Sequence, residues 1–305
     1  MHIVAALGGN ALLRRGEPLS SAAQAQNAAR AATAIAALVA LGHRVTLTHG
    51  NGPQVGLLAL QAAAGPPDSV QPLDSLDAES EGWIGYLLEQ ELANALPAGT
   101  EIATLLTRIE VDAADPAFAA PSKPIGPVYD EETAKRLAAA RGWTVVPDGP
   151  KFWRRAVASP APLAILNAAS ILRLTQAGVF VICAGGGGIP VVRGGADKWR
   201  GIEAVIDKDA ASALLAEQIG ADALLLLTDV DAVYLNYGTP AQTRLRELTL
   251  EEAAAHTFAA GSMGPKIAAA CRFARRTGHI AAIGRLEDAA AILAGTAGTS
   301  VRRAR

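Results

Sequence analysis

Three of the six lysines in this chain stand in settings that suit the binding of an anion. Lys123 is expected on a loop that three prolines stiffen, and Lys208 and Lys266 each begin an expected helix. A cation at a helix N-terminus opposes the helix dipole unless it faces an anion. A compact ammonium group neutralises phosphate oxygens as a point charge. The three lysines therefore suggest a site for phosphate chemistry.

Four apolar runs of the strand type end abruptly in short polar or glycine-rich turns. These turns are Gly8-Gly9-Asn10, Gly50-Asn51-Gly52, the glycines 185–188, and Thr228-Asp229-Val230-Asp231. Glycines at such a turn let backbone N–H groups converge on an anion beside the next helix. Ordinary strand-to-helix geometry would explain any one of them. Four together favour a site that holds several phosphate groups.

Other common catalytic patterns are missing from the sequence. It contains no GxxxxGK[ST] loop, no GxGxxG fingerprint and no GxSxG elbow, and its five histidines lack metal-ligand spacing. His49 ends an apolar run, and we expect it to have a structural role. The remaining glycine turns, lysines and aspartates suit phosphoryl transfer, in which a protein positions two anions and neutralises their charge.

The composition narrows the class of protein. A net charge of −2 and a pI near 6.2 provide no basic face for nucleic acid. No apolar run has the length of a membrane helix, and the first residues lack the order of a signal peptide. Two cysteines, Cys183 and Cys271, form no disulfide framework or zinc pattern, so we expect a cytoplasmic protein.

Apolar runs and amphipathic segments alternate along most of the chain, which predicts an α/β fold with a mainly parallel sheet covered on both faces. Expected strands cover residues 2–7, 45–49, 101–111, 179–184, 224–227, 280–283 and 299–301, with a hairpin of 191–193 and 202–206. Expected helices cover 20–42, 52–64, 82–96, 163–177, 208–219 and 266–277, with shorter helices after Thr249 and from Leu286. The expected N-terminal caps are Ser20 or Ser21 for the first helix, Asp207 for the helix at 208–219 and Thr249 for the helix after it. Residues 65–80 are expected to form a loop.

Residues 112–162 interrupt this alternation and are rich in proline. They contain an expected short helix at 131–140 and two expected strands at 144–146 and 152–157. Because the segment has apolar residues of its own, we expect an inserted subdomain rather than a linker.

Six motifs, in unbroken order from Ile3 to about Val301, resemble carbamate kinases of the amino-acid-kinase superfamily. They are Ala6-Leu7-Gly8-Gly9-Asn10-Ala11-Leu12, Thr48-His49-Gly50-Asn51-Gly52-Pro53-Gln54-Val55-Gly56, Lys123-Pro124-Ile125-Gly126-Pro127, Cys183-Ala184-Gly185-Gly186-Gly187-Gly188-Ile189-Pro190-Val191, Glu203-Ala204-Val205-Ile206-Asp207-Lys208-Asp209 and Gly261-Ser262-Met263-Gly264-Pro265-Lys266. The second and third are the most specific to that family.

The resemblance implies an open αβα sandwich with a protruding subdomain, at about 112–162, that closes over the active site. An N-terminal lobe, about 1–200, would bind carbamoyl phosphate, and a C-terminal lobe, about 201–305, would bind ADP or ATP. The family interconverts carbamoyl phosphate and ADP with carbamate and ATP, uses Mg²⁺ and works as a homodimer. The helix at 82–96, apolar on most sides, is a candidate for the subunit contact.

The resemblance also implies roles for particular residues. The transferring group would meet Gly8, Gly9, Asn10, Gly50, Asn51, Gly52, Gly186 and Gly187. Lys123, Lys208 and Lys266 would stabilise its charge, with Asp209 orienting lysines. The nucleotide would meet Thr228, Asp229, Tyr234 and Met263, and Mg²⁺ would be held mainly by nucleotide phosphates. Ala161 and Asn167 depart from the family pattern, which often has a lysine and a glutamate at these places.

Two alternatives remain open from the sequence. The chain could phosphorylate another small carboxylate, such as acetylglutamate or aspartate, or it could be a catalytically silent sensor of a nucleotide or carbamoyl phosphate. Loss of a motif lysine would favour the sensor, but Lys123, Lys208 and Lys266 are all present. The enzyme is therefore the preferred hypothesis.

Overall fold

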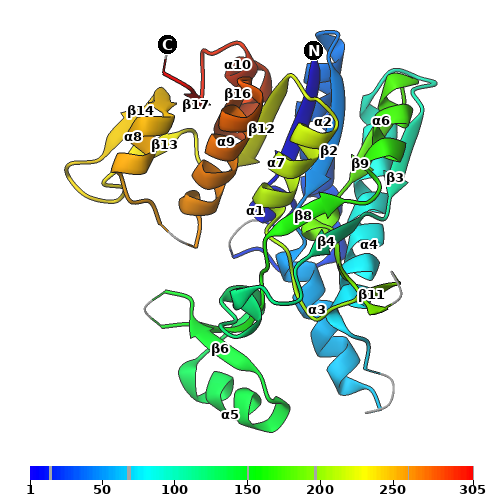
Figure 1. The fold of residues 1–305 in the computed structure, drawn as a ribbon, viewed down its shortest axis with the longest axis vertical. Helices are drawn as coiled ribbons and strands as arrows, with labels where there is room; N and C mark the ends of the chain where they lie inside the picture. Colours follow the sequence, from blue (N-terminus) through cyan, green and yellow to red (C-terminus); the bar gives the residue numbers. More distant parts are fainter. Residues whose placement is uncertain (14–15, 67–69, 150, 196–197, 260, 305) are drawn as a thin grey trace.

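The computed structural model describes residues 1–13, 16–66, 70–149, 151–195, 198–259 and 261–304, apart from the side chains of Asn10 and Ala11. The fold is α/β, as predicted, with a mainly parallel central sheet (Figure 1). Within the described residues, no helix combines the length and apolar character needed to cross a membrane.

Eight strands form the central sheet in the order β15-β17-β16-β12-β1-β2-β9-β3. In chain order they are β1 (His2–Leu7), β2 (Arg44–His49), β3 (Ile102–Leu105), β9 (Phe180–Cys183), β12 (Ala223–Thr228), β15 (Glu247–Thr249), β16 (Ile280–Arg285) and β17 (Thr299–Arg302). All neighbours are parallel except β16 and β17. β1 and β12 are buried along their whole length, which explains their continuous apolar sequences.

The strand order brings the four turns together. β12, β1, β2 and β9 are consecutive in the sheet, and in register Leu7 is level with both Leu227 and His49. The carboxyl ends of parallel strands open at one edge of a sheet, where ligands of such folds commonly bind. The turns that follow Leu7, His49, Cys183 and Thr228 therefore share that edge.

Helices cover both faces of the central sheet, each with its own hydrophobic core. On one face lie α6 (Ala168–Gln176), α7 (Lys208–Gln218) and α9 (Met263–Thr277), with α8 (Leu250–Ala255) beside α9. On the other lie α2 (Ser21–Ala40), α4 (Leu73–Ala95) and α10 (Ala289–Leu293). The short helices are α1 (Gly9–Leu12), η2 (Pro116–Phe118), η3 (Gly185–Gly187) and η5 (Leu286–Asp288).

Three smaller sheets complete the described fold. One joins β11 (Trp199–Gly201), β10 (Ile189–Arg193), β4 (Arg108–Val111) and β8 (Pro162–Ile165), and another is the hairpin of β13 (Val233–Leu235) and β14 (Thr243–Leu245). The third contains β5 (Lys123–Tyr129), β7 (Trp153–Val157) and β6 (Thr144–Pro147), which accompany α5 (Glu131–Arg141). Figure 1 shows α5 and β6 away from the central sheet, on the side opposite the chain ends. This part coincides with the predicted inserted subdomain.

The caps and bounds of several elements were predicted correctly. Ser20 accepts a hydrogen bond from the Ala23 N–H and caps α2, and Thr249 and Glu252 form a complete capping box on α8. α3 (Gly52–Ala64) has the predicted bounds, with Pro53 in its first turn. These features depend on local backbone chemistry, which the sequence contains directly.

Four boundaries were wrong. α4 begins at Leu73, within the expected loop 65–80, because Leu73 and Leu76 pack with α3 and β5. The expected strand 101–111 divides into β3 and β4 in different sheets, and the expected helix 163–177 divides into β8 and α6. Residues 202–206 form no strand, and β10 pairs instead with β11.

Apolar side chains of α4 pack in the hydrophobic core of this chain. Ile84, Leu88 and Leu92 are buried in the cluster shared with α2 and the sheet. Tyr86, on the same helix, is 64% exposed. The subunit contact expected along this helix therefore stays a prediction.

Candidate active site

Lys208, Asp209 and Lys266 meet at the N-terminal ends of two neighbouring helices. Asp209 accepts a hydrogen bond from Lys208 Nζ at 2.5 Å through Oδ1 and from Lys266 Nζ at 3.1 Å through Oδ2. α7 and α9 pack together and so bring the two lysines, 58 positions apart in the sequence, onto one carboxylate. The cluster contains two ammonium groups and one carboxylate. It therefore has an excess positive charge.

Burial strengthens the electrostatics of this cluster. Asp209 is 3% exposed and Lys208 is 9% exposed. Burial alone raises the pKa of Asp209, but the Lys208 and Lys266 ammonium groups outweigh it and hold that pKa well below its usual range. Burial lowers the pKa of Lys208 despite the attraction of Asp209. An incoming anion would meet little competition from water here.

Lys123 belongs to the first position of β5, whereas the sequence analysis expected it on a loop. Its Nζ donates a hydrogen bond of 2.6 Å to Asp207 Oδ2. The Oδ1 atom of Asp207 caps α7 by accepting from the Asp209 and Ala210 N–H groups. Burial raises the pKa of Asp207, but the Lys123 ammonium outweighs this and lowers it. Asp207 thus ties the subdomain to the helix that carries Lys208.

The first two glycine turns touch each other and the lysine cluster. A Cβ atom on Gly50 would lie 3.2 Å from the Gly9 nitrogen and 3.3 Å from Lys208 Cδ. A Cβ atom on Gly8 would lie 3.1 Å from the Leu227 carbonyl oxygen. Side chains at these positions would push the turns apart. The predicted glycine sites Gly8, Gly9 and Gly50 are therefore brought together with Lys208.

A polar face of α4 holds the second and third turns, through Asn51 and Gly185. Asp77, Ser80 and Glu81 have the spacing that places side chains on one side of a helix. Asn51 Nδ2 donates to Asp77 Oδ1 at 3.0 Å and to Ser80 Oγ at 2.8 Å. Glu81 accepts from the Gly185 N–H at 2.7 Å and from the Thr107 N–H at 3.1 Å. We call Asp77, Ser80 and Glu81 the α4 polar face.

Because they lack side chains, the glycines of η3 let the backbone of this loop lie close to the α4 polar face and the residues around it. A Cβ on Gly185 would lie 2.4 Å from the His49 ring and 2.8 Å from Glu81 Cγ. A Cβ on Gly186 would lie 2.1 Å from Asn51 Nδ2, and one on Gly187 would lie 2.4 Å from the Ile206 carbonyl oxygen. Gly186 and Gly187 also have positive φ angles, which favour glycine. Sterically, only glycine fits these positions.

The titratable groups around the α4 polar face are held neutral. Burial raises the pKa of Glu81 to about 8 and raises the pKa of Asp77 well above its usual value. Burial lowers the pKa of His49 to about 4. Asp77 Oδ2 and His49 Nε2 are buried with no hydrogen-bond partner in the described part of the chain. His49 is fully buried, and its expected structural role stays a prediction.

The residues expected at the nucleotide are more dispersed. Thr228 ends β12, and its Oγ1 donates to Asp229 Oδ1 at 3.1 Å. Tyr234 lies on β13 and donates to Asp231, while Met263 begins α9 and packs against the core of that face. Among the described residues, no side-chain hydrogen bond or ion pair joins Tyr234 or Met263 to the lysine cluster. Their roles stay predictions.

Four further positions complete the comparison with the sequence analysis. Gly52 begins α3, and a Cβ there would meet nothing within 4 Å. The side chain of Asn10 lies outside the described residues. Asn167, one of the two departures, accepts the Arg108 N–H through Oδ1 at 3.1 Å and so joins α6 to β4; the other, Ala161, donates its N–H to Asp115.

The sequence analysis missed Asp207 as an ion-pair partner and all of the α4 polar face. Asp207 had been identified only as a helix cap. The spacing of Asp77, Ser80 and Glu81 is a usable signal, but Asp77 and Ser80 fall in the wrongly expected loop and Glu81 lies just before the next expected helix. Their burial, at 1% exposure or less, depends on contacts with distant turns.

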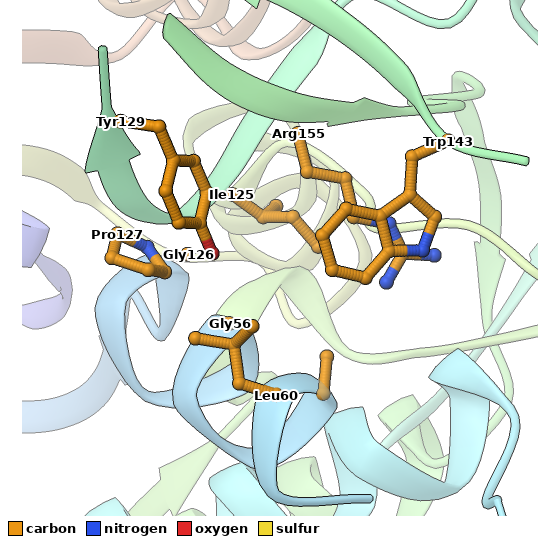
Figure 2. A pocket seen from close by; sticks show the side chains of 9 residues that line it. Gly56, Leu60, Ile125, Gly126, Pro127, Tyr129, Trp143 and Arg155 are labelled. Carbon is orange, nitrogen blue, oxygen red and sulfur yellow. The ribbon is translucent and has the colours of Figure 1, made fainter. Parts of the chain in front are cut away.

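A small pocket marks the junction between the subdomain and α3. In Figure 2, Ile125, Gly126, Pro127 and Tyr129 of β5 lie over Gly56 and Leu60 of α3, with Trp143 and Arg155 alongside. A Cβ on Gly56 would lie 1.8 Å from Gly126 Cα. The two backbones therefore touch, and this contact fixes the strand that carries Lys123.

The fold and this site place the chain in a known class. The model of the amino acid kinase family matches residues 1–284, and the chain belongs to that family.

Within the family, the full-length similarity is to carbamate kinases. The carbamate kinase of Rhizobium meliloti is 51% identical over 303 residues, covering 99% of this chain and 93% of that protein. The structure of Giardia lamblia carbamate kinase bound to citric acid has a TM-score of 0.93 and 40% identity, with 99% and 98% coverage. The same Giardia enzyme bound to AMP-PNP has a TM-score of 0.89, 39% identity and the same coverage.

Proposed function

We propose that this chain is an enzyme that reversibly transfers a phosphoryl group from carbamoyl phosphate to ADP, giving carbamate and ATP. The observation that carries the proposal is the pair of ammonium groups held by the buried Asp209, next to the Gly9 and Gly50 turns. The relatives of about 50% identity are carbamate kinases over their full length, which supports the same reaction.

The proposed chemistry is a direct in-line transfer. An oxygen of the ADP β-phosphate attacks the phosphorus of carbamoyl phosphate, and the bond from that phosphorus to the carbamate oxygen breaks. In both directions the attacking oxygen is already anionic, so no general base is needed. Lys208 and Lys266 would neutralise the oxygens of the transferring group, which is the main contribution a protein makes to phosphoryl transfer.

Lys123 would complete this set from the subdomain. Its ammonium group reaches Asp207, two residues before Asp209, so it already lies beside the lysine cluster. A phosphoryl group with several negative oxygens would attract Lys123 and hold the subdomain over the site. The backbone contact between Gly56 and Gly126 supports a fixed position for this strand.

We propose that Mg²⁺ accompanies the nucleotide. Among the described residues, no group of three His, Cys, Asp or Glu side chains is arranged to hold a metal ion. Mg²⁺ bound with nucleotides usually keeps several waters and takes its other ligands from phosphate oxygens. The ion would supply further neutralisation of the nucleotide phosphates, while the lysines serve the transferring group.

The two halves of the chain would divide the substrates. The turns after β1, β2 and β9, in residues 1–200, would bind carbamoyl phosphate with Gly8, Gly9, Asn10, Gly50, Asn51, Gly52, Gly186 and Gly187. Residues 201–305 would bind ADP with Thr228, Asp229, Tyr234 and Met263. The Giardia relative bound to AMP-PNP supports a nucleotide site in this fold.

The experiment is ATP formation from ADP and Mg²⁺ with three phosphoryl donors in parallel. We expect carbamoyl phosphate to be the efficient donor, acetyl phosphate to be poor and acetylglutamyl phosphate to be inactive. Activity with acetylglutamyl phosphate alone would refute the proposal in favour of another carboxylate kinase. Inactivity with all three donors, together with nucleotide binding, would indicate a sensor. We also propose a homodimer, which light scattering at micromolar concentration tests.

A further inference from the structure

Two consecutive hydrogen bonds join β2 to the start of α7. Ser212 Oγ donates to the Lys208 carbonyl oxygen at 2.6 Å, one turn back along the helix. A serine hydroxyl group has a single hydrogen, so in its 2.7 Å contact with Thr48 Oγ1 the Ser212 oxygen is the acceptor. Thr48 therefore donates to Ser212, and Ser212 donates to the backbone of Lys208.

The burial of both hydroxyl groups makes this link specific. Thr48 and Ser212 are 0% exposed, and the core on this face of the sheet is otherwise apolar. A buried hydroxyl group without a partner is unfavourable, so the pair favours the position of α7 over β2 in which the two groups meet. A satisfied polar pair inside an apolar core specifies one arrangement, whereas apolar contacts tolerate small shifts.

A second contact between the same two segments lies beside the first. Gly50 comes two residues after Thr48, and a Cβ on it would lie 3.3 Å from Lys208 Cδ. The Lys208 ammonium group itself is held by Asp209 at 2.5 Å. The backbone, the side-chain stem and the ammonium group of Lys208 therefore each have a fixed neighbour.

We propose that Thr48 and Ser212 are positioning residues for phosphoryl transfer, which set the place of the Lys208 ammonium group in the site. The inference rests on the proposed function, in which Lys208 neutralises the transferring group. A displacement of about 1 Å at a catalytic group can cost about 10² in rate. The hydroxyl pair thus affects kcat through the position of α7 and without touching the substrate.

Thr46 provides a matched control on the same strand. It is also fully buried, and its Oγ1 lies 2.9 Å from Nε2 of His2, the first residue of β1. Side chains two positions apart share a face of a strand, so Thr46 and Thr48 face the same core. Both threonines have a buried hydrogen bond to a side chain, but of the two only that of Thr48 leads to Lys208.

The test measures kcat and the KM for ADP, with carbamoyl phosphate as the donor, in wild type, Thr48→Val, Ser212→Ala and Thr46→Val. Valine keeps the branched shape of threonine and removes the hydroxyl group. We expect Thr48→Val and Ser212→Ala each to lower kcat by about tenfold and to leave the KM for ADP unchanged, because Lys208 is displaced. Thr46→Val should lower the melting temperature and leave kcat unchanged. Thr48→Ser keeps the hydroxyl group and should keep most of the wild-type kcat.

A second comparison shows whether the effect passes through Lys208. In the Lys208→Met background, Thr48→Val should leave the residual kcat unchanged, because no ammonium group remains to be positioned. A further loss of about tenfold in that background would overturn the inference, since Thr48 would then act on another group.

Wild-type kcat in a folded Thr48→Val protein would overturn the inference. Equal losses of kcat in Thr48→Val and Thr46→Val would also overturn it, because they would indicate a general loosening of the core. Thermal melting identifies a variant that fails to fold, and Ser212→Ala then serves in place of Thr48→Val, since alanine is the better helix former.

The wild-type protein separates this inference from the proposed function. Inactivity of wild type with carbamoyl phosphate would refute the proposed function. If wild type uses another acyl phosphate, the same variants are compared with that donor, because Lys208 serves the phosphoryl group that all acyl phosphates share. An active wild type with an equally active Thr48→Val refutes only the role of the hydroxyl pair.

Discussion

Two polar clusters, the lysine cluster and the α4 polar face, adjoin the same edge of the central sheet, and they differ in the charge state of their carboxyl groups. In the lysine cluster, Lys208 and Lys266 share Asp209, so the groups remain ionised and the total charge is positive. The α4 polar face has two carboxyl groups and no cation paired with them among the described residues, and burial keeps both neutral. The first arrangement attracts an anion, and the second positions backbone and amide groups.

The difference has a simple physical origin. An ionised group can stay charged when buried only if an opposite charge and hydrogen bonds replace water. Asp209 has two ammonium partners, whereas Glu81 has hydrogen bonds from Thr107 and Gly185, which lower its pKa by less than burial raises it. A carboxyl group is thus kept ionised in the lysine cluster and neutral on the α4 polar face.

The largest expected effect comes from removing a charge from the lysine cluster. Lys208→Met should lower kcat by about 10²–10³, because it removes a preorganised cation from the transferring group. Lys151→Met, at an exposed position, is the matched control and should leave kcat unchanged. A Lys208→Met protein that folds and keeps full kcat would show that the cluster is structural.

Lys123 adds a third ammonium group beside the lysine cluster, and its removal should have the second largest effect on kcat. Lys123→Ala should lower kcat by about 10² and leave the KM for ADP unchanged. Asp207→Asn keeps a good helix cap but loses the ion pair, so its loss should be about tenfold. In the Lys123→Ala background, Asp207→Asn should add little, because the two residues act as a pair. Additive losses would mean that Asp207 acts independently of Lys123.

The packing of the α4 polar face is tested at Gly185. Gly185→Ala places a methyl group against the His49 ring and Glu81, and should lower the free energy of unfolding by about 1–3 kcal/mol. Gly195→Ala is the control, since a Cβ there meets nothing within 4 Å. Urea unfolding measures both variants. Equal stability of the two would contradict the close approach at Gly185.

The smallest expected effect is a dependence of stability on pH. Between pH 6.5 and 8 native Glu81 keeps a proton that the unfolded chain has lost. The unfolding free energy should therefore fall as pH rises, by up to about 1.4 kcal/mol per pH unit for this group. Glu81→Gln should flatten that slope, while Glu79→Gln, exposed on the same helix, should not.

Two neighbours of Glu81 affect the design of this measurement. Asp77 has a raised pKa and contributes to stability in the same direction, so Glu81→Gln reduces the slope without abolishing it. The lowered pKa of His49 acts in the opposite direction, but only between about pH 4 and 6.5, below the measured range. An identical slope in wild type and Glu81→Gln would show that Glu81 is ionised in the folded protein.

Local chemistry explains what was predicted well. The cap at Ser20, the capping box at Thr249 and the glycine turns depend on residues within a few positions of each other. The same holds for Asp207 at the start of α7. The fold class followed from alternation along the chain. The main boundary error, at Leu73, arose because tertiary packing extended a helix into a segment of loop composition.

The sequence by itself determined most strands of the central sheet, the turns that end them and the three lysines suited to phosphate. The tertiary structure decided which of these meet: the strand order placed four turns at one edge, and the packing of α7 on α9 joined Lys208 and Lys266 through Asp209. It alone revealed the α4 polar face. Burial and charge state depend on neighbours far away in the sequence, as Gly185 is 104 positions from Glu81, and no local pattern contains that information.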